Sequence, residues 1–333
     1  MYKFAQMTNK DRDFVFNNVS IKKGISKEII EKDFWVCLML DYLFTKSKYK
    51  SHLTFKGGTS LSKGFDIIKR FSEDIDLILD WTVLGSGIAE PLEERSKNKQ
   101  DIFNKSLNSK AEEFIKNELL VDIRDNLSKL LNTEINIQVD EEDCQVLNFY
   151  YPKVYFAQTD YIKQYVRLEI GPLAAWTPSE NIKITPYVCD IMPQVFDYKC
   201  TNVLTVAPER TFWEKATILH REANRPAEKQ MKPRYARHYY DLYMFSKTPY
   251  MLNALKDKSL LKKVVTFKMK FYRDSWAKYE ECLTNNLRLV PSEFRLKELE
   301  KDYEEMKEMF YGEVPKFNEI IEQLKIVEKL INA

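Results

Sequence analysis

Two aspartates separated by one residue, Asp74 and Asp76, are the side chains whose type and spacing best fit a catalytic role. Asp74 precedes, and Asp76 interrupts, an apolar run over residues 75–79 that predicts a β-strand. On a strand, residues i and i+2 point to the same face and lie about 6–7 Å apart along the chain. Mg²⁺ prefers oxygen ligands and usually takes one or two protein carboxylates plus substrate phosphates. We therefore expect Asp74 and Asp76 to bind a divalent cation, Mg²⁺ or Mn²⁺.

A glycine pair precedes the aspartates. Gly57 and Gly58 follow a short expected strand, residues 52–55, and Thr59 or Ser60 can cap a helix that runs to about Ile68. The start of such a helix exposes backbone N–H groups and the positive end of the helix dipole, which suits a triphosphate. An Asp-x-Asp pair alone is usually a solvated strand edge or turn. An aspartate within an apolar run would be costly if it were buried without a partner. The glycine turn at a helix start, followed by two aspartates in an apolar run, therefore favours a metal site.

The rest of the chain provides the elements that must position these residues. Strands are expected at residues 134–139, 146–150, 165–170, 181–188 and 203–206. Helices are expected at residues 26–44 and 101–131, from Pro208 onward, and at 238–246, 251–278 and 292–331, the last interrupted near 312–315. This pattern predicts an α/β (α+β) domain with a mixed sheet over residues 1–205, including N-terminal helices, followed by a helical domain over residues 206–333.

Composition limits the class of protein without identifying it. The chain has 333 residues with 52 Lys plus Arg and 50 Asp plus Glu, so its formal net charge of +2 does not by itself predict a nucleic-acid partner. The five cysteines include no Cys-x-x-Cys pair, which argues against a zinc site or a disulfide framework. Neither a signal peptide nor a long apolar run is evident, so we expect a cytoplasmic protein with no membrane span.

The stretch from Phe55 to Leu79 resembles the nucleotidyltransferases related to DNA polymerase β, whose signature is Gly-Gly or Gly-Ser, a spacer and Asp-x-Asp. The spacer here is somewhat longer than usual. The fuller string, Lys-Gly-Gly-Thr-Ser-Leu-Ser-Lys followed by Arg-Phe-Ser-Glu-Asp-Ile-Asp-Leu, resembles the AbiEii/AbiGii-type abortive-infection toxins. The resemblance includes residues 31–35 and the helical segments around Lys215 and Asp241. It implies a polymerase-β-like fold and Mg²⁺-dependent transfer of NMP from an NTP to an acceptor, with RNA (a tRNA 3′ end) as the leading acceptor and a separately encoded antitoxin as a partner.

The resemblance also implies roles for individual residues. The nucleotide phosphates would be held by Gly57, Gly58, Thr59, Ser60 and Lys63, with Arg70 and Ser72 contacting phosphate or orienting the loop. Lys215 would match a downstream lysine that binds nucleotide phosphates, and Asp241 would match a late acidic residue. Glu169, on the strand expected at 165–170, is the best third carboxylate.

Each of these supporting residues has a structural alternative. Glu169 can be an exposed strand residue paired with a lysine. Lys215 can be a lysine whose stem packs on an apolar helix while its ammonium reaches water. Asp241 lies among tyrosines and needs a partner, which a tyrosine hydroxyl or Lys215 would provide.

The clearest local basic patch is the segment from Arg221 to Arg237. Phosphate-backbone contact is one interpretation, and a solvated loop is the other. The residues that we expect to contact RNA are Arg221, Arg225, Lys232, Arg234 and Arg237. Two other functions stay open from the sequence: transfer to a small molecule such as an aminoglycoside, and a catalytically inactive NTP- or RNA-binding regulator.

Overall fold

The computed structural model of the chain describes residues 1–155, 163–198 and 200–333. Their contacts divide the chain into two compact units. The first comprises Met1–Gly64 and Ser72–Thr205, and the second comprises Phe65–Phe71 and Val206–Ala333. Residues 65–71 therefore belong with the C-terminal part of the chain, although they lie between the glycine pair and the aspartates in sequence. None of the helices in the described parts of the chain is long and apolar enough to cross a membrane.

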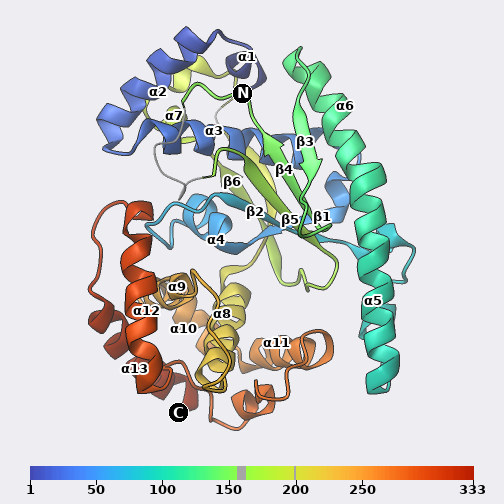
Figure 1. Ribbon diagram of the computed structural model, residues 1–333, viewed down its shortest axis with the longest axis vertical. Coiled ribbons are helices and arrows are strands. Elements are labelled where there is room, and N and C mark those ends of the chain that lie inside the picture. The colour runs from blue at the N-terminus through green and yellow to red at the C-terminus, as the bar shows by residue number, and fades with distance from the viewer. Residues whose placement is uncertain (156–162, 199) are drawn as a thin grey trace. The chain divides into compact units, whose positions relative to one another are not determined.

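A seven-stranded mixed sheet forms the centre of the first unit, with strand order β3-β4-β5-β2-β1-β7-β6 (Figure 1). The strands are β1 (Leu53–Lys56), β2 (Asp74–Leu79), β3 (Asn136–Val139), β4 (Val146–Tyr150), β5 (Val166–Gly171), β6 (Ser179–Ile184) and β7 (Thr201–Val206). β2 pairs antiparallel with β1 and parallel with β5, while β4 pairs antiparallel with both β3 and β5. The predicted mixed α/β class is confirmed.

The sequence of β2 explains how the sheet presents the two aspartates. Ile75, Leu77 and Leu79 alternate along the strand and are buried, which fixes one face of β2 against the core. Asp74 and Asp76 consequently point to the opposite face, where both are partly accessible. A register shift of one residue would exchange the two faces, so burial of the apolar residues determines where the carboxylates lie.

Helices surround the sheet in the first unit. They are α1 (Tyr2–Ala5), α2 (Asn9–Lys23), α3 (Lys27–Asp41), α4 (Gly57–Thr59), α5 (Lys97–Phe114), α6 (Leu120–Leu131) and α7 (Tyr187–Ile191). Helix α3 begins after Ser26, whose hydroxyl accepts a hydrogen bond from the Ile29 N–H, and it packs against β2 and β5 (Figure 1). Helices α5 and α6 are joined by a π-helical turn, Ile115–Leu119, and α6 packs against β3.

Two sequence predictions in this unit need correction. The helix expected from the glycine pair to Ile68 ends at Gly64, after α4 and a π-helical turn, Ser60–Gly64. Asp66 adopts a left-handed φ of 52°, which a continuing helix does not permit. The strand expected over residues 181–188 ends at Ile184, because Pro186 precedes the first turn of α7.

The second unit is helical. It contains α8 (Pro208–Ala223), α9 (Ala236–Phe245), α10 (Pro249–Lys256), α11 (Lys258–Phe271), α12 (Glu293–Glu305) and α13 (Phe317–Asn332). The single helix expected over residues 251–278 is instead two helices that meet at Asp257, and the second of them ends at Phe271. The Asp257 carboxylate caps α11 by accepting a hydrogen bond from the Leu260 N–H, and this competes with helix continuation. The apolar periodicity continues through the break, so the pattern alone does not reveal it.

Candidate active site

The glycine turn lies directly against the aspartate pair. Gly57 has a φ of +85°, and a Cβ atom added to it would lie 1.8 Å from Oδ2 of Asp76 and 2.5 Å from its Cγ. Residue 57 must therefore be glycine both for its backbone conformation and for its closeness to the carboxylate. The Thr59 hydroxyl donates to the main-chain oxygen of Asp74 at 2.5 Å, and the Ser60 hydroxyl donates to that of Gly57 at 2.8 Å. The Thr59 bond fixes the turn to the start of β2, and the Ser60 bond closes the turn itself.

Three carboxylates share one face of the sheet at this point. In the parallel pairing of β2 and β5, Asp74 lies opposite Arg167 and Asp76 lies opposite Glu169. Burial, and then the negative charges of Glu73, Asp76 and Glu169, raise the pKa of Asp74 to about 7. The carboxylates thus repel one another, and a bound cation would relieve that repulsion.

The donor set fits Mg²⁺ through two carboxylates rather than three. Among residues 1–155, 163–198 and 200–333, no group of three or more His, Cys, Asp or Glu side chains is arranged to hold a metal ion. The Glu169 carboxylate accepts a hydrogen bond from Nε of Arg167 at 3.1 Å, so its partner is an arginine on its own strand. Asp74 and Asp76 would supply one or two carboxylate ligands, and Mg²⁺ usually takes its other ligands from substrate phosphates and water. A direct role for Glu169 as a third ligand stays a prediction.

Buried ion pairs hold the elements that carry the site. Lys32 of α3 binds Glu73, the residue before Asp74, with an Nζ–Oε2 distance of 2.6 Å. Asp33 binds Lys63 at 2.8 Å and accepts from the Tyr187 N–H at 2.7 Å. Lys32 and Asp33 are each 1% exposed. The charged run within an otherwise apolar helix is the sequence signal that could have identified these partners, because buried charges need compensation.

Some of the predicted nucleotide-binding residues lie in the turn beside Asp76, and others have different surroundings. Gly57, Thr59 and Ser60 form the turn beside Asp76, with Gly58 in the same short helix. Lys63 is buried in its pair with Asp33, and its ammonium lies 3.6 Å from the centre of the Tyr187 ring. Ser72 directly precedes Glu73 and is half-buried. Phosphate binding by Lys63 and Ser72 stays a prediction.

In the second unit, Arg70, Lys215 and Asp241 form one network. Arg70 donates from Nε and Nη2 to the two Asp241 oxygens at 2.8 and 2.9 Å, and Lys215 Nζ donates to Oδ2 at 2.7 Å. Burial alone would raise the pKa of Asp241, but the charges of Arg70 and Lys215 outweigh it and hold that pKa well below its usual range. Lys215 is the partner expected for Asp241 on structural grounds, and Arg70 is a second partner. Binding of nucleotide phosphates by Arg70 and Lys215, and a catalytic role for Asp241, stay predictions of the family resemblance.

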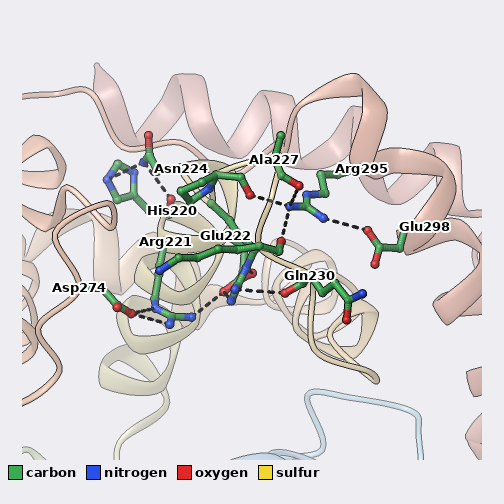
Figure 2. Close-up of polar contacts among 12 residues, drawn as sticks. His220, Arg221, Glu222, Asn224, Ala227, Gln230, Asp274, Arg295 and Glu298 are labelled. Carbon is green, nitrogen blue, oxygen red and sulfur yellow. Dashed lines mark hydrogen bonds and ion pairs between the residues drawn. The ribbon is translucent and has the colours of Figure 1, made fainter.

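The basic segment is partly neutralised within the same unit (Figure 2). Arg221 donates to Asp274 at 2.8 and 2.5 Å and to Glu222 at 2.7 Å, while Arg225 donates to both oxygens of Glu222. Arg295 of α12 donates to the carbonyl oxygens of residues 226, 227 and 229 and so connects α12 to the loop. Arg221 and Arg225 thus serve the folding of this loop.

The remaining expected RNA contacts lie near the loop's C-terminal end. Lys232 is exposed, and Arg234 and Arg237 are half-buried. Contact of RNA with any residue of the segment stays a prediction.

A glycine turn packed against an Asp-x-Asp pair on a mixed sheet is the arrangement of a nucleotidyltransferase. Residues 39–323 match the family described as "Nucleotidyl transferase AbiEii toxin, Type IV TA system". The chain belongs to this family and is a nucleotidyltransferase toxin, so the family resemblance and the enzyme class predicted from the sequence are confirmed.

Among solved structures, the chain is similar to MenT4, a nucleotidyltransferase toxin from Mycobacterium tuberculosis. The sequence identity is 15%, the TM-score is 0.42, and the match covers 92% of this chain and 100% of that one. No curated protein is a significant match in sequence.

Proposed function

We propose that this toxin transfers a nucleoside monophosphate from an NTP to RNA, with Mg²⁺ bound by Asp74 and Asp76. The contact of Gly57 with the Asp76 carboxylate supports the proposal most strongly, because it brings a phosphate-binding turn and metal-binding oxygens together. Toxins of this kind act with an antitoxin, and we propose that a separately encoded one controls this chain. Its site of action is then the cytoplasm, where RNA is available.

The reaction is an in-line displacement at the α-phosphorus of the NTP. A hydroxyl oxygen of the acceptor attacks, a new P–O bond forms, and the bond to the β-phosphate oxygen breaks, so that pyrophosphate leaves and the hydroxyl proton passes to solvent or a nearby carboxylate. The backbone N–H groups of Gly57, Gly58 and Thr59 bind the β- and γ-phosphates, while the Ser60 N–H donates to the Gly57 carbonyl and closes the turn. When bound, Mg²⁺ neutralises charge on the phosphates and orients the attacking and leaving oxygens.

RNA is the acceptor that we favour, and a tRNA 3′ end is the leading choice from the family resemblance. Within the basic segment, Lys232, Arg234 and Arg237 are the residues that we propose to contact the phosphate backbone. Arg221 and Arg225 make a smaller contribution, since carboxylates already bind them.

A labelled transfer assay tests the function. The protein is incubated with each α-labelled NTP, Mg²⁺ and total RNA, and in parallel with a small-molecule fraction that includes aminoglycosides. We expect the label to appear in RNA with at least one NTP, to disappear with EDTA, and to be lost in Asp76→Asn. Asp13→Asn, on the exposed surface of α2, is the matched control and should retain activity.

Two results would contradict the proposal. Label in a small molecule but not in RNA would assign a different acceptor. Full toxicity of Asp76→Asn in cells, without any transfer by the wild type, would indicate a binding protein that has lost the chemistry.

A further inference from the structure

One face of the sheet continues from the aspartates across three neighbouring strands. Strand partners point to the same face, and Arg167 lies opposite both Asp74 on β2 and Asn148 on β4. Asn148 in turn lies opposite Gln138 on β3. These four residues are polar: Asn148 is buried, Asp74 and Arg167 are partly accessible, and Gln138 is exposed.

Two tyrosines lie on this face at the end nearest the aspartates. Tyr150 ends β4 and Tyr165 directly precedes β5, so continuing the β4–β5 register by one residue places them opposite each other. Their ring centroids are 5.2 Å apart with an interplanar angle of 50°. Tyr150 is exposed and Tyr165 is half-buried. Tyr165 is two residues from Arg167, about 7 Å along the strand, and so lies within one nucleotide's reach of Asp74.

Arg167, Asn148 and their carboxylate partners connect the strands of this face by side-chain hydrogen bonds. Arg167 donates from Nη1 to Asp140 at 3.0 Å and from Nε to Glu169 at 3.1 Å, and Asn148 also donates to Asp140 at 2.8 Å. The tyrosines consequently stand on strands that are cross-linked by side chains. Such a surface is preorganised for a ligand that lies across it.

The direction of the reaction determines which substrate reaches the tyrosines. The glycine turn lies on the β1 side of β2. With the β- and γ-phosphates on this turn, as proposed above, the pyrophosphate would leave toward β1. An in-line displacement requires the attacking oxygen to approach from the opposite side of the α-phosphorus. The opposite side of β2 is β5, followed by β4, where the tyrosines lie. The acceptor, not the NTP, therefore faces the tyrosine pair.

We propose that Tyr150 and Tyr165 form a stacking platform for the unpaired terminal base of a polynucleotide acceptor. This inference rests on the proposed function, because it uses the direction of transfer. Aromatic side chains bind single-stranded bases by stacking, with little preference for sequence. A base stacked on the platform directs its own ribose hydroxyl toward the aspartates. Arg167 lies between Tyr165 and Glu169 on β5, opposite Asp74, and orients the acceptor end.

A structural role for the tyrosines makes different predictions. A cross-strand aromatic pair can simply stabilise the β4–β5 pairing. Removing the rings would then lower the unfolding temperature without changing the KM for one substrate in particular. The test must therefore measure stability and both substrates separately.

The variants are Tyr150→Ala/Tyr165→Ala, Tyr150→Phe/Tyr165→Phe and the single exposed change Tyr150→Ser, with Phe14→Ala as a control that removes an exposed aromatic ring elsewhere in the same unit. Transfer is measured to an RNA oligonucleotide with an unpaired 3′ end, to the same strand in a blunt duplex, and to its DNA counterpart. Binding of the 5′-fluorescein-labelled oligonucleotide without NTP is measured by anisotropy.

We expect the alanine pair to raise the KM and Kd for the unpaired oligonucleotide about tenfold or more, with the KM for NTP unchanged. The phenylalanine pair and Phe14→Ala should behave as the wild type, and Tyr150→Ser should show an intermediate increase. The blunt duplex should be a poor acceptor. The DNA arm shows whether the ribose 2′-hydroxyl is also recognised.

The platform is refuted if the alanine pair changes only the unfolding temperature, if the KM for NTP rises instead, or if Phe14→Ala has the same effect. If the wild type transfers no label to any RNA, the proposed function fails. The anisotropy measurement then tests separately whether the tyrosine pair binds the oligonucleotide. Binding by the wild type that the alanine pair loses would then uphold the platform. If the wild type does not bind the oligonucleotide, the proposed platform is refuted.

Discussion

Gly57 lies so close to the Asp76 carboxylate that position 57 has no room for a side chain: an added Cβ atom would lie 1.8 Å from Oδ2. The antiparallel pairing of β1 and β2 causes this contact, because it places Lys56 opposite Asp76 and starts the turn one residue later. The positions of the glycine turn and the Asp76 carboxylate therefore depend on each other. A change at one of them moves the other.

Gly57→Ala should reduce transfer activity about a hundredfold or more. The methyl group displaces the Asp76 carboxylate by on the order of 1 Å, and misplacements of that size cost about two orders of magnitude in rate. The backbone strain of a left-handed alanine adds about 1–2 kcal/mol of lost stability. Activity is measured by label transfer, and stability by urea unfolding.

Gly85→Ala is the matched control for that variant. Gly85 has a similar φ of +79°, but an added Cβ would contact nothing within 4 Å. It should lose similar stability and keep its activity. Equal loss of activity in both variants would show that backbone strain, and not the contact with Asp76, is responsible.

Asp241→Asn should destabilise the protein by about 3–5 kcal/mol. The substitution leaves the buried charges of Arg70 and Lys215 without their shared carboxylate, and uncompensated buried charges are costly. Urea unfolding measures the loss. Glu322→Gln, in the exposed pair with Lys325 of the same unit, should change stability by less than about 1 kcal/mol. An Asp241→Asn variant as stable as Glu322→Gln would contradict a structural role for the network.

The sequence predicts those parts of the site whose residues are near one another in the chain. Asp74 and Asp76 share a face because strands have a period of two, and the glycine pair precedes a helix start. The mixed sheet followed by helices was predictable from the change in apolar periodicity near Pro208. The family resemblance added the connection between the turn and the carboxylates.

Contacts between distant residues were not predictable. Lys32 and Glu73 are 41 positions apart, and Arg70 and Asp241 are 171 apart. Nothing in local periodicity indicates which buried charges will meet, because burial depends on how the elements pack. The basic segment shows the same limit: its charges can be counted, but one of the two carboxylates that bind Arg221 belongs to Asp274, 53 positions away.

His220 makes the second unit sensitive to mild acid. Its Nε2–H donates to the Lys278 carbonyl at 2.9 Å, while Nδ1 accepts from the Arg288 N–H at 2.9 Å, so the ring must be neutral. Burial lowers its pKa below 6.5. Below about pH 6.5 the unfolded chain therefore binds a proton that the native ring does not, and stability falls by up to about 1.4 kcal/mol per pH unit.

Urea unfolding of the wild type and His220→Gln between pH 5 and 8 tests this. The stability advantage of the wild type should be largest above pH 7 and should shrink as the pH falls. An advantage that is independent of pH would show that His220 does not titrate between the folded and unfolded states.

Lys232 and Arg225 should differ in what they contribute to the basic segment. Lys232 is exposed, so Lys232→Ala should leave the unfolding temperature unchanged and reduce the slope of log Kd for single-stranded RNA against log salt concentration by about 0.7. Arg225 binds both oxygens of the buried Glu222, so Arg225→Ala should cost about 1–3 kcal/mol of stability.

Anisotropy titrations at several salt concentrations, paired with urea unfolding, separate the two effects. If Arg225→Ala changes the salt slope as much as Lys232→Ala and leaves stability intact, then its ion pair with Glu222 opens when RNA binds. The segment would then act as a phosphate-binding surface along its whole length. If neither variant changes the slope, RNA is bound elsewhere, and the sheet face beside Asp74 becomes the main contact.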